Sequence, residues 1–146
     1  MAETASIPAV DTHEDPRVAR WLRHAAQHDA ADLRAQLAED AVFFSPVVHT
    51  PQAGRERTFA YLDAAGHVFA DSGFAYRKII VDGAHAMLEF TAEIDGISIN
   101  GIDLISWNAD GEIAEFKVMV RPMKAMNMLW EKMAAMLAAA DDGSSG

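Results

Sequence analysis

The chain has 146 residues, a net charge of −10 and no cysteine. Its length fits one domain with one core, and a hydrophobic content of 51% excludes a disordered chain. The negative charge is spread along the sequence, which argues against nucleic acid and anionic membranes as partners. No apolar run reaches the ~18 residues that a membrane span needs. Because the chain lacks cysteine and a signal-peptide pattern, we expect a cytoplasmic protein.

The two ends differ in composition from the rest of the chain. Residues 1–14 mix Pro, Thr, Glu and Asp without periodicity, which predicts a flexible leader. Residues 139–146 contain the polar run DDGSSG, which predicts a flexible tail and could be a leftover linker. Residues 15–138 are therefore expected to form the folded domain.

The first half of this domain has helical signals. Asp15 followed by Pro16 is typical of a helix start, and apolar residues then recur at helical spacing. Turn residues and apolar runs divide the rest of this half. We predict helices over 16–28, 30–37 and 55–69, with a strand over 41–45 before the third helix.

The second half has strand signals. Segments 74–81, 85–94, 97–107 and 112–120 are separated by the turn sequences DGA, DG and NADG. Apolar and polar residues alternate in 85–94, so we expect an antiparallel sheet that is covered on one face. A last helix is predicted from residue 123 to residue 140. Helices followed by a run of strands indicate an α+β fold.

Two stretches, LAEDAVFFSPVVHTPQAG and GIDLISWNADGEIAEF, together with this element order, resemble the NTF2-like superfamily. The resemblance covers residues 15 to 137. Within the superfamily, the chain is more specifically similar to SnoaL-like proteins and their relative ketosteroid isomerase. It implies a cone in which a curved antiparallel sheet wraps around the N-terminal helices, with a C-terminal helix and a deep apolar pocket. It also implies homodimers through the outer sheet face. The superfamily includes isomerases, cyclases, hydrolases, transport factors and ligand carriers, so the fold leaves the function open.

Alignment with ketosteroid isomerase places three of its chemical positions on this chain. The position of its catalytic Asp, the base, falls on Ser45, and that of its oxyanion-binding Tyr falls on Trp21. Its second oxyanion donor, a protonated Asp, falls on Asp103 and is retained. Because Ser45 is not basic and Trp21 is only an N–H donor, we do not expect steroid isomerisation by that mechanism.

SnoaL cyclases use an acid on the inner wall of the pocket for proton transfer. The inward positions inferred for the last strand here are Phe116, Val118 and Val120, and all three are apolar. This composition argues against the cyclase reaction, unless an acid elsewhere in the pocket replaces the missing group.

Asp103 is the strongest candidate for chemistry. By alternation it shares a strand face with apolar residues, namely Ile99, Gly101, Ile105 and Trp107. Burial there raises the pKa of a carboxyl group unless a donor pairs with it. A neutral Asp103 could donate to a carbonyl or an oxyanion, and an ionised one could act as a base. A structural Asp bonded to buried donors such as the Trp21 indole is the open alternative.

The histidines carry weaker signals. Ser45 and His49 suggest a nucleophilic pair, but a strand broken at Pro46 gives no reason for contact between them. We expect Ser45 as a pocket hydroxyl and His49 at the rim or in solvent. His24 and His28 have the i, i+4 spacing of metal ligands but lack a third ligand, so we expect no metal and place both near solvent.

The last helix is rich in methionine, which packs against irregular shapes. One interpretation is a soft lid over an apolar ligand. The other is a helix packed on the body through a buried stripe of residues, namely Met126, Leu129, Trp130, Met133 and Leu137.

These expectations define a pocket for a small hydrophobic molecule, without a metal or cofactor. Its substrate-binding wall is predicted to consist of Trp21, Phe43, Ser45, His49, Tyr61, Leu88, Phe90, Phe116 and Val118. One hypothesis is cofactor-independent proton transfer of the isomerase, cyclase or lyase type, with Asp103 as acid or base. The alternatives are a ligand-binding or dimerisation domain without chemistry, or a pocket redesigned for a non-natural reaction.

Overall fold

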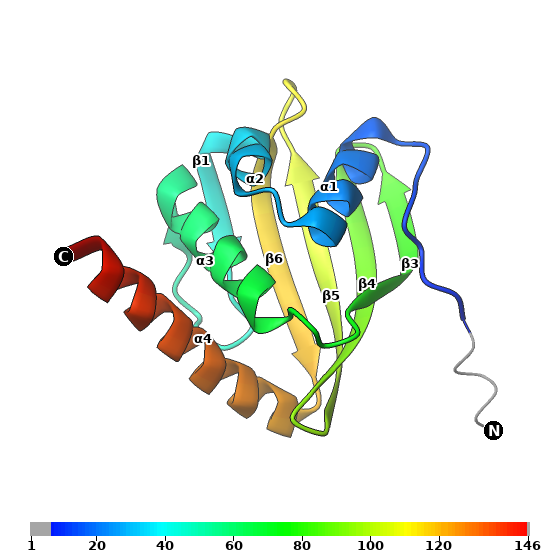
Figure 1. The fold of residues 1–146 in the computed structure, drawn as a ribbon. Coiled ribbons are helices and arrows are strands. Elements are labelled where there is room, and N and C mark those ends of the chain that lie inside the picture. The colour runs from blue at the N-terminus through cyan, green and yellow to red at the C-terminus, as the bar shows by residue number, and fades with distance from the viewer. Residues whose placement is uncertain (1–6, 146) are drawn as a thin grey trace.

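The computed structural model describes residues 7–145 and contains a six-stranded sheet with helices on one face (Figure 1). The helices are α1 (Pro16–Gln27), α2 (Ala30–Gln36), α3 (Arg55–Val68) and α4 (Met123–Ser145). The strands are β1 (Leu37–Phe44), β2 (Gln52–Ala53), β3 (Ala75–Asp82), β4 (His85–Ile94), β5 (Ile97–Trp107) and β6 (Ile113–Arg121). None of the described helices is long and apolar enough to cross a membrane.

The sheet has the strand order β2-β1-β6-β5-β4-β3. Strands β3 to β6 form the predicted antiparallel hairpins, whereas β1 runs parallel to β6. The sheet is therefore mixed, and the wholly antiparallel sheet that we predicted needs correction at this pair. Hairpin turns specify only strands that are neighbours in sequence, so they carried no signal for a pairing across the whole domain.

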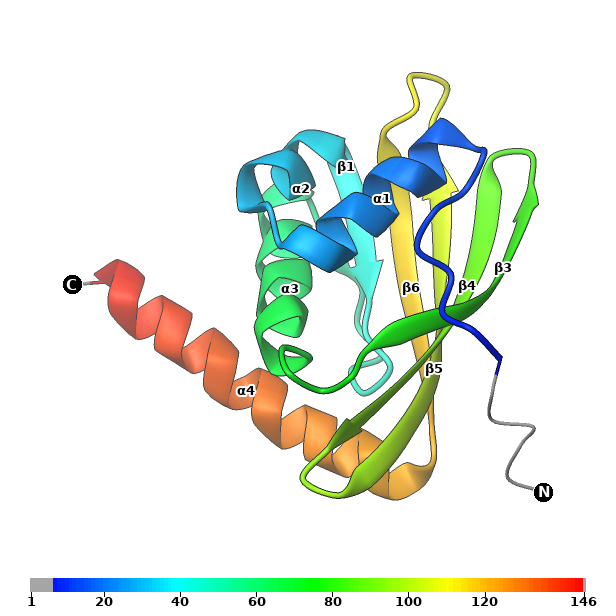
Figure 2. The ribbon, with the colours of Figure 1, turned by 45° about the vertical axis from the view of Figure 1, so that its right-hand side comes forward.

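The sheet curves around α1, α2 and α3, which cover its concave face (Figure 2). Helix α4 packs against α3, β5 and β6 across the open end of the cone (Figure 2). The sheet is curved without closing into a barrel. This arrangement confirms the predicted α+β cone.

The concave face carries the core. Leu88 and Phe90 of β4 are fully buried, as the alternation of that strand predicts. Helix α1 begins where the Asp15 carboxylate accepts a hydrogen bond from the backbone N–H of Arg17, at 2.9 Å. From this start, helical periodicity turns Trp21 and His24 toward the sheet, and both are buried.

Both ends of the chain are placed by this fold. The predicted flexible leader lies partly outside the described residues, in 1–6. Its described part lies against β3, where the N–H of Val10 donates to the carbonyl of Tyr76 at 2.8 Å. At the other end, α4 continues to Ser145, beyond residue 138 where the sequence predicts a tail.

Candidate active site

A cavity of about 240 Å³ lies between the concave face of the sheet and helices α1, α3 and α4. Its wall is mostly aromatic and aliphatic. A few polar side chains interrupt this wall, namely His24, His28, Ser45, Tyr61, Tyr76 and Asp103. Such a cavity suits a hydrophobic molecule that carries few polar groups.

The structure brings Asp103 and most of the predicted wall to this cavity. The predicted residues that line it are Trp21, Phe43, Ser45, Tyr61, Phe90, Phe116 and Val118. His49 and Leu88 do not line it. His49 is exposed in the loop between β1 and β2, directly after Val48, which still lines the cavity. Leu88 faces inward as predicted, but it is fully buried, so neighbouring core side chains cover it.

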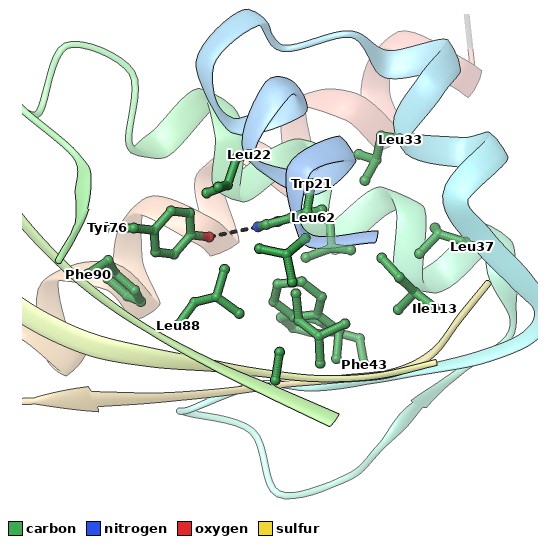
Figure 3. Close-up of a cluster of buried hydrophobic side chains, with 14 of the residues drawn as sticks. Trp21, Leu22, Leu33, Leu37, Phe43, Leu62, Tyr76, Leu88, Phe90 and Ile113 are labelled. Atoms are coloured by element: carbon green, nitrogen blue, oxygen red, sulfur yellow. Dashed lines mark hydrogen bonds between the residues drawn. The ribbon is translucent and has the colours of Figure 1, made fainter. Parts of the chain in front are cut away.

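A chain of buried hydrogen bonds crosses one end of the cavity. The indole Nε1–H of Trp21 donates to the hydroxyl oxygen of Tyr76 at 2.8 Å (Figure 3). The Tyr76 hydroxyl donates in turn to Oδ2 of Asp103 at 2.5 Å. Trp21, Tyr76 and Asp103 are all buried. Thus Asp103 is paired, as the structural alternative expects, but its direct partner is Tyr76 and the indole lies one step further away.

The register of the sheet explains how Tyr76 reaches Asp103. Tyr76 on β3 pairs with Phe90 on β4, which pairs with Gly101 on β5. Asp103 lies two residues beyond Gly101 and so points to the same concave face. Since Gly101 has no side chain, the Phe90 ring occupies the space in front of it: a Cβ on Gly101 would lie 2.3 Å from Phe90 Cζ.

Burial dominates the electrostatics of this pair. It raises the pKa of Asp103 to about 7, while the hydrogen bond from Tyr76 acts in the opposite direction. Burial, followed by the charge of Asp103, also raises the pKa of Tyr76 well above its usual value. Tyr76 therefore keeps its proton, and Asp103 gains or loses one near neutral pH.

The second carboxyl oxygen of Asp103 is available to a ligand. Oδ2 accepts from Tyr76, whereas Oδ1 has no hydrogen-bond partner among residues 7–139. Because Asp103 lines the cavity, a molecule bound there can reach this oxygen.

Ser45 occupies the wall without the features of a catalyst. Its Oγ accepts hydrogen bonds from the backbone N–H groups of Val47, at 3.1 Å, and Val48, at 3.3 Å. These bonds stabilise the turn that follows β1. The hydroxyl therefore acts as a turn acceptor at the cavity edge, and it has no His49 partner.

Two functional candidates were missed in the sequence. Tyr76 lies in an apolar strand, and only the pairing of β3 with β4 shows that its hydroxyl reaches Asp103. His24 was placed near solvent, which is wrong: it is 7% exposed and lines the cavity. Its i, i+3 spacing from the buried Trp21 was the signal that could have placed it inward. Its neighbour His28 is exposed but also reaches the cavity wall.

Helix α4 supplies one side of the cavity. The residues of the predicted stripe that reach it are Leu129, Trp130, Met133 and Leu137. Leu129 is buried, but Trp130 is 51% exposed, so the stripe is less buried than predicted. Helix α4 lies at the open end of the cone, below the helices that cover the concave face (Figure 2).

A curved sheet around a helix-covered apolar cavity is the architecture of the NTF2-like cone. The family model of the SnoaL-like domain matches residues 18–116, which is more than half of the chain. The chain therefore belongs to the SnoaL-like domain family, and it has the NTF2-like fold. No curated protein sequence matches the chain significantly.

Solved structures resemble the chain over most of its length. A steroid delta-isomerase from Pseudomonas aeruginosa is 34% identical, with 90% of this chain and 98% of that protein covered and a TM-score of 0.82. An uncharacterised protein with a cystatin-like fold from Silicibacter pomeroyi is also 34% identical, with 84% and 85% covered and a TM-score of 0.77. An NTF2-like protein of unknown function from Mesorhizobium loti, 24% identical, shares the fold, with 77% and 100% covered and a TM-score of 0.65.

Proposed function

We propose that this protein binds a small hydrophobic carbonyl compound and catalyses cofactor-independent proton transfer on it, with Asp103 as the acid at the carbonyl oxygen. The observation that carries the proposal is the buried pair of Tyr76 and Asp103 at the cavity wall. A carboxyl group held near its neutral form in an apolar site can donate a hydrogen bond to a developing oxyanion.

The hydrogen bonds favour one oxygen of Asp103 as the carrier of the proton. The Tyr76 hydroxyl accepts from the Trp21 indole and has one proton to donate, which supports a chain that runs from Trp21 through Tyr76 to Oδ2 of Asp103. In that arrangement the proton of a neutral Asp103 belongs on Oδ1, the oxygen that Tyr76 leaves to a ligand. In an apolar cavity such a donor stabilises negative charge on an enolate oxygen more strongly than it would in water.

The relation to the steroid delta-isomerase from Pseudomonas aeruginosa supports this class of reaction. The resemblance to ketosteroid isomerase places an oxyanion-binding Tyr at Trp21. In this chain the hydroxyl next to Asp103 comes from Tyr76 on β3, and Trp21 supports it with its N–H. A phenol and a carboxyl group thus lie together in the cavity, supplied by different elements.

A second candidate is a ligand-binding domain without chemistry. Ser45 favours it, because the place where the isomerase keeps its base holds a hydroxyl whose oxygen accepts two backbone hydrogen bonds. In that case Asp103 would bind the carbonyl of a ligand without any exchange of a carbon-bound proton.

Exchange of carbon-bound hydrogen for deuterium separates the two candidates. The probe is 2-tetralone, a hydrophobic ketone with acidic protons next to the carbonyl, incubated with the protein in D₂O and followed by NMR. We expect exchange above the buffer background, a loss of about 100-fold in Asp103→Asn, and no change in Asp110→Asn, whose side chain is exposed.

The binding of 2-tetralone is measured on the same samples by calorimetry. Binding without exchange in the unsubstituted protein would support the ligand-binding alternative and contradict the catalytic proposal. Exchange that survives in Asp103→Asn would contradict the role of Asp103. Absence of both binding and exchange would contradict both candidates.

A further inference from the structure

The imidazole of His24 is an unused polar group at the same cavity. It is 7% exposed, it lines the wall, and its Nδ1 is buried without a hydrogen-bond partner among residues 7–139. Leaving a buried polar atom without a partner destabilises the folded state. Folded proteins rarely accept this cost without a reason, and catalysis is one of the reasons.

His24 lies next to the hydrogen-bonded chain that ends at Asp103. It follows Trp21 by one turn on the buried face of α1, and the centroids of the two rings are 5.1 Å apart. The Trp21 indole bonds to Tyr76, which bonds to Asp103. The acid and the imidazole therefore line one cavity, and the Trp21 indole contacts both groups of this site, directly or through Tyr76.

The surroundings of His24 keep its ring neutral. Burial is the main cause that lowers its pKa, and the nearby His28 adds to this effect. The backbone carbonyl of Asp29 and the carboxylates of Asp32 and Asp63 act in the opposite direction. Because Nδ1 is enclosed by protein, the nitrogen that can meet a ligand is Nε2, and its lone pair is free when the proton of the neutral ring lies on Nδ1.

We propose that His24 is the base that accepts the carbon-bound proton, the role that the hydroxyl of Ser45 cannot fill. This inference rests on the proposed function, because it needs a carbonyl group bound at Asp103. It also narrows the substrate class to hydrophobic ketones with a C–H bond next to the carbonyl.

The step balances without any other reagent. The C–H bond breaks, its proton goes to the imidazole, and its electron pair forms a carbon–carbon double bond while the carbonyl electrons move to oxygen. Asp103 stabilises the resulting enolate by donating its hydrogen bond. The imidazolium then returns a proton to the same carbon, or to a conjugated carbon further along, which isomerises an unsaturated ketone.

Two substitutions of His24 test this role by the 2-tetralone exchange assay. His24→Gln keeps a polar side chain at this position, whereas His24→Leu introduces an apolar one. Neither side chain can accept a proton from carbon. We expect both to lose exchange by about 100-fold, the lower range for general bases. The control is His85→Gln, since His85 is exposed at the start of β4 and lies off the cavity wall.

Urea unfolding separates catalysis from folding. Because Leu removes the unpartnered nitrogen, we expect His24→Leu to unfold at the same or a higher urea concentration than the unsubstituted protein. Exchange within about threefold of the unsubstituted protein in both folded variants would overturn the role of His24. If Asp103→Asn lost exchange while the two His24 variants kept it, the proposed function would survive without the role of His24. If the unsubstituted protein showed no exchange, the proposed function and the role of His24 would both fail.

Discussion

The hydroxyl of Tyr76 on β3 lies 2.5 Å from Oδ2 of Asp103 on β5, across the intervening strand β4. The Trp21 indole of α1 completes the chain of donors. These hydrogen bonds connect helix α1 to strands β3 and β5 of the sheet at the cavity wall. It also leaves Oδ1 of Asp103 as the oxygen that a ligand can use.

Tyr76→Phe removes the centre of this chain. It leaves the Trp21 indole N–H and Oδ2 of Asp103 without their partner, and each loss costs about 1–3 kcal/mol. We expect the free energy of unfolding, measured in urea, to fall by about 2–4 kcal/mol. Tyr61→Phe is the matched control, because the Tyr61 hydroxyl has no hydrogen-bond partner among residues 7–139. An equal change in the two variants would show that the hydrogen bonds of the Tyr76 hydroxyl add nothing measurable to stability.

The ionisation of Asp103 predicts the pH dependence of stability. Its pKa is about 7 in the folded protein, against 3.8 for the ordinary side chain, so the folded state binds the proton more tightly. The free energy of unfolding contributed by this group therefore falls as pH rises from about 4 through about 7. Asp103→Asn removes the charge. We therefore expect the free energy of unfolding of this variant to exceed that of the unsubstituted protein by up to about 4 kcal/mol at about pH 8.

The unsubstituted protein must be compared with Asp103→Asn, because His24 changes the free energy of unfolding with pH in the opposite direction. Its folded pKa lies below 6.5, so its contribution to stability is lost as pH falls below that value. His24 is present in both proteins and cancels in the difference. A difference that stays constant between about pH 5 and about pH 8 would show that Asp103 is not desolvated.

Gly101→Ala tests the packing in front of the cavity. The new Cβ would lie 2.3 Å from Phe90 Cζ and 2.8 Å from the carbonyl oxygen of Met119, and the backbone atom cannot move away cheaply. Overpacking of this kind costs about 1–3 kcal/mol. Urea unfolding should show this loss, and displacement of Phe90 into the cavity should weaken 2-tetralone binding. Unchanged stability and binding together would contradict the tight contact between Gly101 and Phe90.

The proposed roles of His24 and Asp103 predict a bell-shaped pH profile for kcat/KM of exchange. Catalysis needs His24 without its proton, so the rate falls on the acid side, below 6.5. It needs Asp103 with its proton, so the rate falls on the alkaline side, above about 7. Exchange rates of 2-tetralone across this range check the shape. A rate that rises steadily with pH would indicate hydroxide or an ionised Asp103 as the base.

Local patterns were sufficient to predict most elements and the concave face. The strands His85–Ile94 and Ile97–Trp107 have the predicted bounds, because turn residues flank them and their side chains alternate. The first strand begins at Leu37, whereas residue 41 was predicted. The second helix accordingly ends at Gln36. Its exposed Glu39 and Asp40 had hidden this extension, since they interrupt the apolar run.

The site was predictable only in part. Asp103 follows from alternation within one strand, but its bond to Tyr76 depends on the pairing of two strands with a third. The burial of His24 depends on how α1 is rotated over the sheet. Pairing between strands leaves no periodic signal in a single sequence, whereas the i, i+3 spacing of His24 from Trp21 did carry one.

The most direct test of this account is the pKa of the Asp103 carboxyl group, measured by carbon NMR titration and assigned with the Asp103→Asn variant. We predict a value of about 7, because the carboxyl group is buried at an apolar cavity and Tyr76 is its one hydrogen-bond partner among residues 7–139. A value near the ordinary 3.8 would mean that Asp103 is ionised at neutral pH and unable to donate to a carbonyl, which would contradict the proposed acid.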